Sequence, residues 1–83
     1  MITKQKIEIY LKYQDADLLA RSGSADEKSI MNEDWVLIDD LLHDIYLLKN
    51  NLVSFEMRSE IEKRIHQYTG NNKELAEELF NIK

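Results

Sequence analysis

The 83-residue chain contains no cysteine and no proline, and it has only two glycines. Without cysteine it can form neither a disulfide framework nor a thiolate metal site. Without proline and with little glycine it has few of the residues that end helices and make turns, so long helices are favoured over a many-turned β fold. Because small secreted domains usually depend on disulfides, we expect a cytoplasmic protein.

Long apolar runs are also missing. The first ten residues, MITKQKIEIY, have charges every few positions and lack the apolar stretch of a signal peptide. Apolar stretches such as residues 46–48 are far too short to cross a bilayer. A chain this short buries only roughly 60% of its unfolded surface. We therefore expect one helical domain, residues 1–83, with modest stability and no membrane partner.

Negative charge is concentrated in one part of the chain, whose formal net charge is −5 at pH 7. Residues 13–48 hold nine acids against two bases, whereas residues 49–83 are balanced and residues 1–12 are slightly basic. The nine acids are Asp15, Asp17, Asp26, Glu27, Glu33, Asp34, Asp39, Asp40 and Asp44. A localised field of one sign attracts partners of the opposite sign, so a basic partner is favoured.

The spacing of apolar residues predicts helices over about residues 3–20, 32–50, 55–68 and 73–81, with a short helix over residues 25–30. Residues 14–17 are a candidate break in the first helix. The alternation from Ile7 to Leu11 also fits a strand, but helical spacing persists beyond Leu11, and we prefer a helix. The predicted fold class is all-α, a small bundle of four main helices with short loops.

Several helix starts carry short polar residues that can accept hydrogen bonds from first-turn amides. They are Ser24, Asn32, Ser54 and either Asn71 or Asn72. Glu27 lies three residues after Ser24 and completes a capping box. Gly23, just before that box, fits the left-handed position that follows a helix.

The helix predicted over residues 32–50 has a broad apolar arc, typical of a central helix with several neighbours. The arc contains Ile38, Leu41, Leu42, Ile45, Leu48 and Leu52, flanked by Trp35 and Leu37. The next helix presents a row made of Met57, Ile61, Ile65 and Tyr68. We expect these side chains to form the core.

Opposite the arc, Val36 and Leu47 lie among carboxylates, about three turns apart on one face. This pattern resembles the apolar centre and charged rim of a protein interface. The alternative is that another helix, such as residues 25–30, covers both; we expect burial for Leu47 and exposure for Val36. The predicted partner-binding residues are Asp15, Asp17, Glu33, Val36, Asp39, Asp40, His43, Asp44 and Leu47.

Metal and catalytic chemistry find little support in the sequence. His43 lies within one turn of Asp39 and Asp40, a donor set that suits a transition metal, but the second Glu-x-x-His of bundle metal sites is absent. A calcium-loop pattern starting at Asp15 fails at its third ligand position and at its glycine. No nucleophile motif is present. We therefore predict no metal, no cofactor and no enzymatic activity.

The two helices around Gly70 have the order of a helix-turn-helix DNA reader. The last helix, however, carries Glu74, Glu77 and Glu78 against Lys73. A recognition helix meets phosphate with positive charge, so we predict no nucleic-acid binding.

Two functional hypotheses follow from these patterns. The first is a small acidic binding protein that holds a basic protein partner through an acidic helical surface. Its most concrete form is a bacterial toxin-immunity or antitoxin-type inhibitor, which would mask the cationic face of a toxin domain by charge complementarity. The second is a helical accessory subunit or homodimer with no inhibitor role, whose exposed apolar residues serve assembly.

Overall fold

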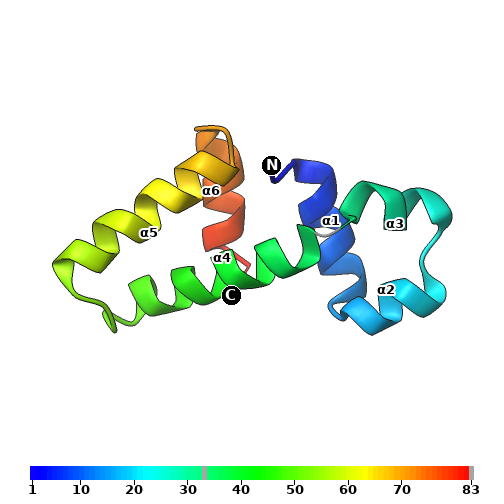
Figure 1. Cartoon of the computed structure of the whole chain (residues 1–83), viewed down its shortest axis with the longest axis horizontal. Coiled ribbons are helices and arrows are strands. Elements are labelled where there is room, and N and C mark those ends of the chain that lie inside the picture. The colour runs from blue at the N-terminus through cyan, green and yellow to red at the C-terminus, as the bar shows by residue number, and fades with distance from the viewer. Residues whose placement is uncertain (33, 83) are drawn as a thin grey trace.

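The computed structural model describes residues 1–32 and 34–82, and this part of the chain forms six helices and no strand (Figure 1). The helices are α1 (Lys4–Tyr13), α2 (Ala16–Ser22), α3 (Ala25–Met31), α4 (Asp34–Lys49), α5 (Phe55–Tyr68) and α6 (Lys73–Phe80). The all-α class is confirmed. The arrangement differs from four main helices because the first predicted helix is divided into α1 and α2.

The division falls at the candidate break. Gln14 has a left-handed backbone with φ of 57°, which ends α1. Asp15 then starts α2, because its side chain accepts a hydrogen bond of 2.8 Å from the amide of Asp17. A continuous helix would place Leu11 and Leu18 on one face, but the chain changes direction between them, and they are 42% and 38% exposed.

Most of the predicted caps are present. The side chains of Ser24, Ser54 and Asn72 accept first-turn amide hydrogen bonds at the starts of α3, α5 and α6. Glu27 completes the capping box of α3. The prediction for Asn32 is wrong: this residue ends α3, with φ of 48°, and its N–H donates to the carbonyl of Lys28.

The two glycines meet different needs. Gly23 has φ of −75°, so the left-handed conformation predicted for it is wrong. Gly23 instead lies where there is no space for a side chain, because a Cβ atom there would lie 2.6 Å from the backbone oxygen of Leu19. Gly70 follows α5 with φ of +64°, a conformation that glycine adopts without steric cost.

The central element is α4, which packs against α1, α5 and α6. Figure 1 shows α1, α2 and α3 gathered at one end of α4, and α5 folding back along its other half. The molecule measures 41 × 22 × 19 Å, and its radius of gyration of 13.2 Å exceeds the value of about 12 Å expected for a compact chain of this length. It is therefore elongated, with the α1–α3 end (residues 1–31) opposite the loop that joins α4 to α5.

The core forms along α4 as predicted. Ile38 and Leu41 are fully buried, and Trp35 is 8% exposed. The start of the chain joins this core, because the Ile2 side chain is buried and its N–H donates to the Tyr68 carbonyl at 2.7 Å. The other buried apolar residues are Ile7, Ile9, Leu19, Met31, Ile45, Leu48, Ile61, Ile65, Ala76 and Leu79.

Two residues predicted to face inward are exposed. Leu52 is 61% exposed because α4 ends at Lys49, and helical spacing no longer places residue 52 on the buried arc. Met57 is 52% exposed because it lies one turn nearer the α4–α5 loop than the buried Ile61. The core therefore stops short of this loop and leaves apolar side chains uncovered there.

Candidate partner-binding surface

Six side chains of α4 lie away from its buried arc and form one surface, which we call the outer face of α4. Their spacings of three, four and seven residues put them on one side of the helix. Val36 is 64% exposed, and Tyr46 is 57% exposed. The outer face consists of Val36, Asp39, Asp40, His43, Tyr46 and Leu47.

The two apolar residues predicted on this face differ in exposure. Val36 lies in solvent, as expected from its position opposite Ile38. Leu47 is half-buried, so its predicted burial holds only in part. The face therefore offers one well-exposed aliphatic side chain, one turn before the carboxylates of Asp39 and Asp40.

Asp39 is held in place by α1. The Tyr10 hydroxyl donates a 2.6 Å hydrogen bond to Asp39 Oδ1. The Tyr10 ring packs on Trp35, with ring centroids 4.6 Å apart and planes tilted by 36°. Burial, assisted by the Asp39 carboxylate, raises the pKa of Tyr10 to about 12. Tyr10 thus stays a protonated donor at neutral pH and fixes one carboxylate at the edge of the outer face.

Asp40 and His43 lie in the middle of the outer face, three residues apart, and both are exposed. Residues at this spacing are neighbours on a helix surface. Within the ranges that the structure describes, no group of three His, Asp or Glu side chains is arranged to hold a metal ion. The arrangement can act as a charged, hydrogen-bonding patch beside Val36.

Asp44 does not belong to this surface, which corrects the sequence-based prediction. It is only 8% exposed, and its Oδ2 lies 2.7 Å from Arg64 Nη1 on α5. Asp44 is on the side of α4 that α5 covers, and the ion pair joins the two helices. It therefore serves the fold and is not available to a partner.

The other predicted residues lie elsewhere or are not described. Asp15 and Asp17 are exposed, but they start α2 at the α1–α3 end of the molecule (Figure 1). Glu33 lies outside the described residues. The predicted residues that the structure brings together are Val36, Asp39, Asp40, His43 and Leu47.

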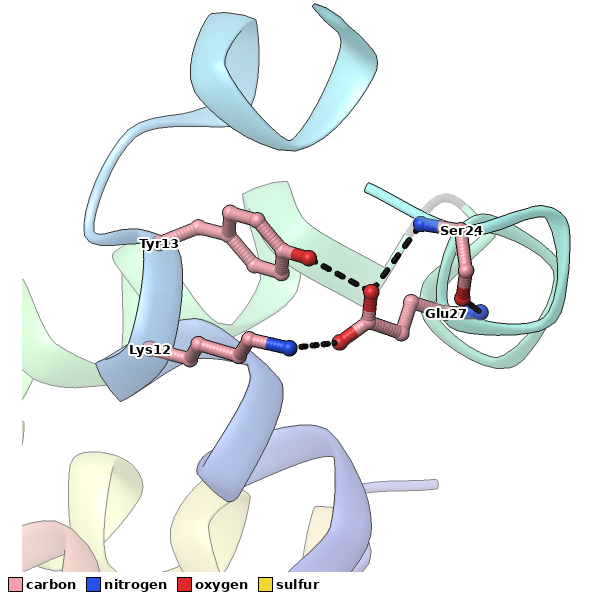
Figure 2. Close-up of polar contacts among 4 residues, drawn as sticks. All are labelled: Lys12, Tyr13, Ser24 and Glu27. Atoms are coloured by element: carbon pink, nitrogen blue, oxygen red, sulfur yellow. Dashed lines mark hydrogen bonds and ion pairs between the residues drawn. The ribbon is translucent and has the colours of Figure 1, made fainter. Parts of the chain in front are cut away.

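Glu27 shows that acids of the 13–48 segment also hold the fold together (Figure 2). Its carboxylate accepts hydrogen bonds from the Ser24 amide at 3.0 Å, from Lys12 Nζ at 2.9 Å and from the Tyr13 hydroxyl. The Ser24 amide, followed by Tyr13 and Lys12, lowers the pKa of Glu27 to about 2. The hydrogen bonds that Tyr13 and Lys12 donate to Glu27 raise the pKa of both residues. Glu27 therefore joins the start of α3 to the end of α1.

Asp34 has a similar structural role. Its carboxylate pairs with Lys6 Nζ, which also donates to the Met1 carbonyl at 3.0 Å. This contact ties the first turn of α4 to α1. With Asp15, Glu27, Asp34 and Asp44 engaged within the protein, the acidic surface is smaller than the sequence alone indicates.

An apolar groove lies beside the outer face, between α4 and α6. Its volume is about 320 Å³, and its lining residues are Leu42, Ile45, Tyr46, Lys49, Asn50 and Leu79. Lys49 also donates to the Phe80 carbonyl, which ties the end of α6 to α4. Tyr46 borders both the groove and the outer face. Tyr46 is not among the predicted partner-binding residues, although its position three residues after His43 and seven after Asp39 places it on the same side of the helix.

Comparison of the chain with protein-family models, with curated proteins and with solved structures gives no match in any of the three. In the part of the chain that the structure describes, no helix has both the length and the apolar character needed to span a membrane.

Proposed function

We propose that this is a small acidic binding protein that holds a basic protein partner on the outer face of α4. One observation carries the proposal: Val36 is 64% exposed on the same face as the carboxylates of Asp39 and Asp40. An apolar contact bordered by charged side chains is a common arrangement in protein interfaces. Asp39 and Asp40 are exposed carboxylates on this face, so the face favours a cationic partner.

The residues of this face would contribute in different ways. Exposed carboxylates speed the encounter with a basic protein more than they strengthen the complex. Val36 and Tyr46 would supply the apolar contact, and tyrosine is among the residues that most often dominate binding energy. Asp39 is already fixed by Tyr10, so binding would not have to order that side chain.

The most concrete form of the proposal is a bacterial toxin-immunity or antitoxin-type inhibitor acting in the cytoplasm. A nuclease toxin must present positive charge to the phosphates of its substrate. An acidic helix placed over that charge would exclude the substrate without entering the chemistry. Small size and a net charge of −5 support this form.

The test is to measure binding of this chain to a basic toxin domain encoded by an adjacent gene, across a salt series. Exposed charge pairs are screened beyond about 10 Å at 0.1 M salt, so affinity should fall steeply with salt. Asp39→Asn with Asp40→Asn should slow association about ten-fold. Asp17→Asn with Asp26→Asn is the matched control, because it removes the same charge from α2 and α3.

Two results would contradict the proposal. Equal effects of the two double variants would mean that net charge, and not the outer face, attracts the partner. A flat response to salt would remove charge steering altogether. The apolar centre has its own check: Val36→Ser should change the free energy of unfolding by no more than about 0.5 kcal/mol while weakening binding.

A further inference from the structure

The loop between α4 and α5 carries exposed apolar side chains that the outer face does not explain. Phe55, the first residue of α5, is 85% exposed, and Leu52 is 61% exposed. We call residues 50–57 the hairpin tip. A large aromatic side chain left almost wholly in water, beside a second apolar residue, is typical of a contact surface.

The hairpin tip has an ordered backbone. The Leu52 N–H donates to the Leu47 carbonyl at 3.0 Å, and the Asn50 side chain donates to the Tyr46 carbonyl at 2.8 Å. Arg58 donates to the Asn51 side chain at 2.8 Å, which joins the loop to α5. Phe55 and Leu52 are therefore presented by a fixed scaffold, and little backbone entropy would be lost when they are covered.

Phe55 and the groove between α4 and α6 lie on the same side of the α4–α5 hairpin. Phe55 precedes His66 by eleven residues, about three turns, so both point to one side of α5. His66 lines a hollow with Ala76 and Phe80 of α6, which identifies this side as the one that α6 occupies. Met57 is two residues, about 200°, further round α5 and so lies on the opposite flank.

The groove has room for a phenyl ring. A cavity of about 150 Å³ lined by aliphatic side chains is large enough to bind benzene. The groove offers about 320 Å³ between Leu42, Ile45 and Leu79. Because Phe55 is 85% exposed, the chain does not fill this groove with its own tip.

The charge of the hairpin tip permits two copies of this acidic chain to meet there. Residues 49–58 contain Lys49, Glu56 and Arg58 as their only charged residues, and so carry +1 in a chain of −5. Two acidic copies can therefore meet here without bringing their outer-face carboxylates together. A basic partner would instead be attracted to the outer face of α4.

We propose that the protein forms a two-fold symmetric dimer in which Phe55 of each copy fills the groove between α4 and α6 of the other. Phe55 projects from the side of the α4–α5 hairpin on which the groove lies. Two copies can therefore each insert Phe55 into the groove of the other, and such reciprocal pairing closes the assembly at two copies. The buried surface is apolar and small, so the dimer is weak and forms at micromolar or higher concentration. This inference goes beyond the proposed function and depends on different residues, apart from Tyr46.

Sedimentation equilibrium of the full chain tests the assembly from about 1 μM to about 1 mM. The mass should rise from 9.8 kDa toward twice that value. Phe55→Ser should weaken dimerisation roughly thirty-fold or more, as loss of a dominant interface residue does. Met57→Ser is the matched control and should leave it unchanged, because Met57 is also exposed but lies on the opposite flank. A monomer throughout, or equal effects of the two variants, overturns the proposal.

The absence of cysteine allows the pairing itself to be tested. When Glu56→Cys and Asn50→Cys chains, which both keep Phe55, are mixed and mildly oxidised, the mixed disulfide should predominate, because Glu56 is exposed beside Phe55 and Asn50 lines the groove. A predominance of Glu56→Cys chains linked to each other would mean that the tips meet directly, which overturns insertion into the groove. Salt separates this proposal from the previous one: dimerisation should persist at high salt, where binding of a basic partner is weakened.

Discussion

The two ends of the molecule differ most in their charged and their large apolar side chains. At the α1–α3 end, polar groups are bonded within the protein, as Glu27 is to Lys12 and Tyr13. At the hairpin tip, apolar side chains such as Phe55 and Leu52 are left in solvent. Charged residues in this protein can therefore be structural, and apolar residues can be free for contact.

Helix length explains the contrast. α2 and α3 have seven residues each, well below the roughly 12–15 residues at which an isolated helix becomes marginally stable in water. They depend on caps and cross-links such as the Glu27 contacts. α4 and α5 have 16 and 14 residues and are held by a long apolar contact. Their connecting loop can leave apolar side chains uncovered without loss of the hairpin.

The largest expected effect is at the α1–α3 end. Met31 is fully buried, and Met31→Ala should lower the free energy of unfolding by about 2–5 kcal/mol, because it removes apolar contacts and leaves a cavity. Denaturant unfolding followed by circular dichroism measures the change. A loss below about 1 kcal/mol would show that the α1–α3 end is not part of the common core. The α1–α3 end would then contribute as little to stability as the hairpin tip is expected to.

The Arg64–Asp44 ion pair should have an intermediate effect. Arg64→Ala leaves the Asp44 carboxylate buried without that partner, and we expect a loss of about 1–3 kcal/mol. Adding Asp44→Asn to Arg64→Ala should recover part of it, since the remaining side chain is uncharged. Purely additive losses in this double-mutant cycle would mean that the two helices do not depend on the pair.

Glu27 should make the α1–α3 end sensitive to acid. Its pKa is lowered from 4.5 to about 2, so its contacts stabilise the folded protein above about pH 4.5 and are lost as the pH falls toward 2. Glu27→Gln should therefore lower the melting midpoint at neutral pH and differ progressively less from the parent near pH 2. Asp26→Asn, a neighbouring charge outside these contacts, serves as the control. A pH-independent difference would argue against an ionic role.

The smallest effect is expected at the hairpin tip. Leu52 is 61% exposed, and Leu52→Ser should change the free energy of unfolding of the monomer by no more than about 0.5 kcal/mol. Thermal melting at a concentration too low for dimerisation measures it. A larger loss would show that the tip supports the fold and would remove the contrast between the two ends.

The features that sequence predicted well are local. The starts of α3, α5 and α6 follow from Ser24, Ser54 and Asn72, because a cap bonds to amides only two or three residues away. The side of α4 that carries Val36, Asp39, Asp40, His43 and Leu47 follows from helical spacing alone. The error at Asn32 is also instructive, since asparagine suits both the start of a helix and a left-handed end.

The features that sequence did not predict depend on distant partners or on helix limits. Sequence spacing does not reveal that Asp44 is buried, because its partner Arg64 is 20 residues away on another helix. The contact that fixes Asp39 comes from Tyr10, 29 residues earlier. Spacing predicts that Leu52 lies in the core because it continues the arc of α4, but the helix ends before reaching it. Periodicity indicates which side of a helix is buried only while the helix continues.

The Glu27 contacts have a consequence for the order of folding. They join residues 14 and 15 positions apart, whereas the Lys6–Asp34 and Tyr10–Asp39 contacts join residues 28 and 29 positions apart. Closing a loop of twice the length costs about 0.6 kcal/mol more in chain entropy, and local contacts form sooner. We expect the α1–α3 end to close before α4 docks on α1. Substitution of Glu27 should then mainly slow folding, whereas substitution of Asp34 should mainly speed unfolding.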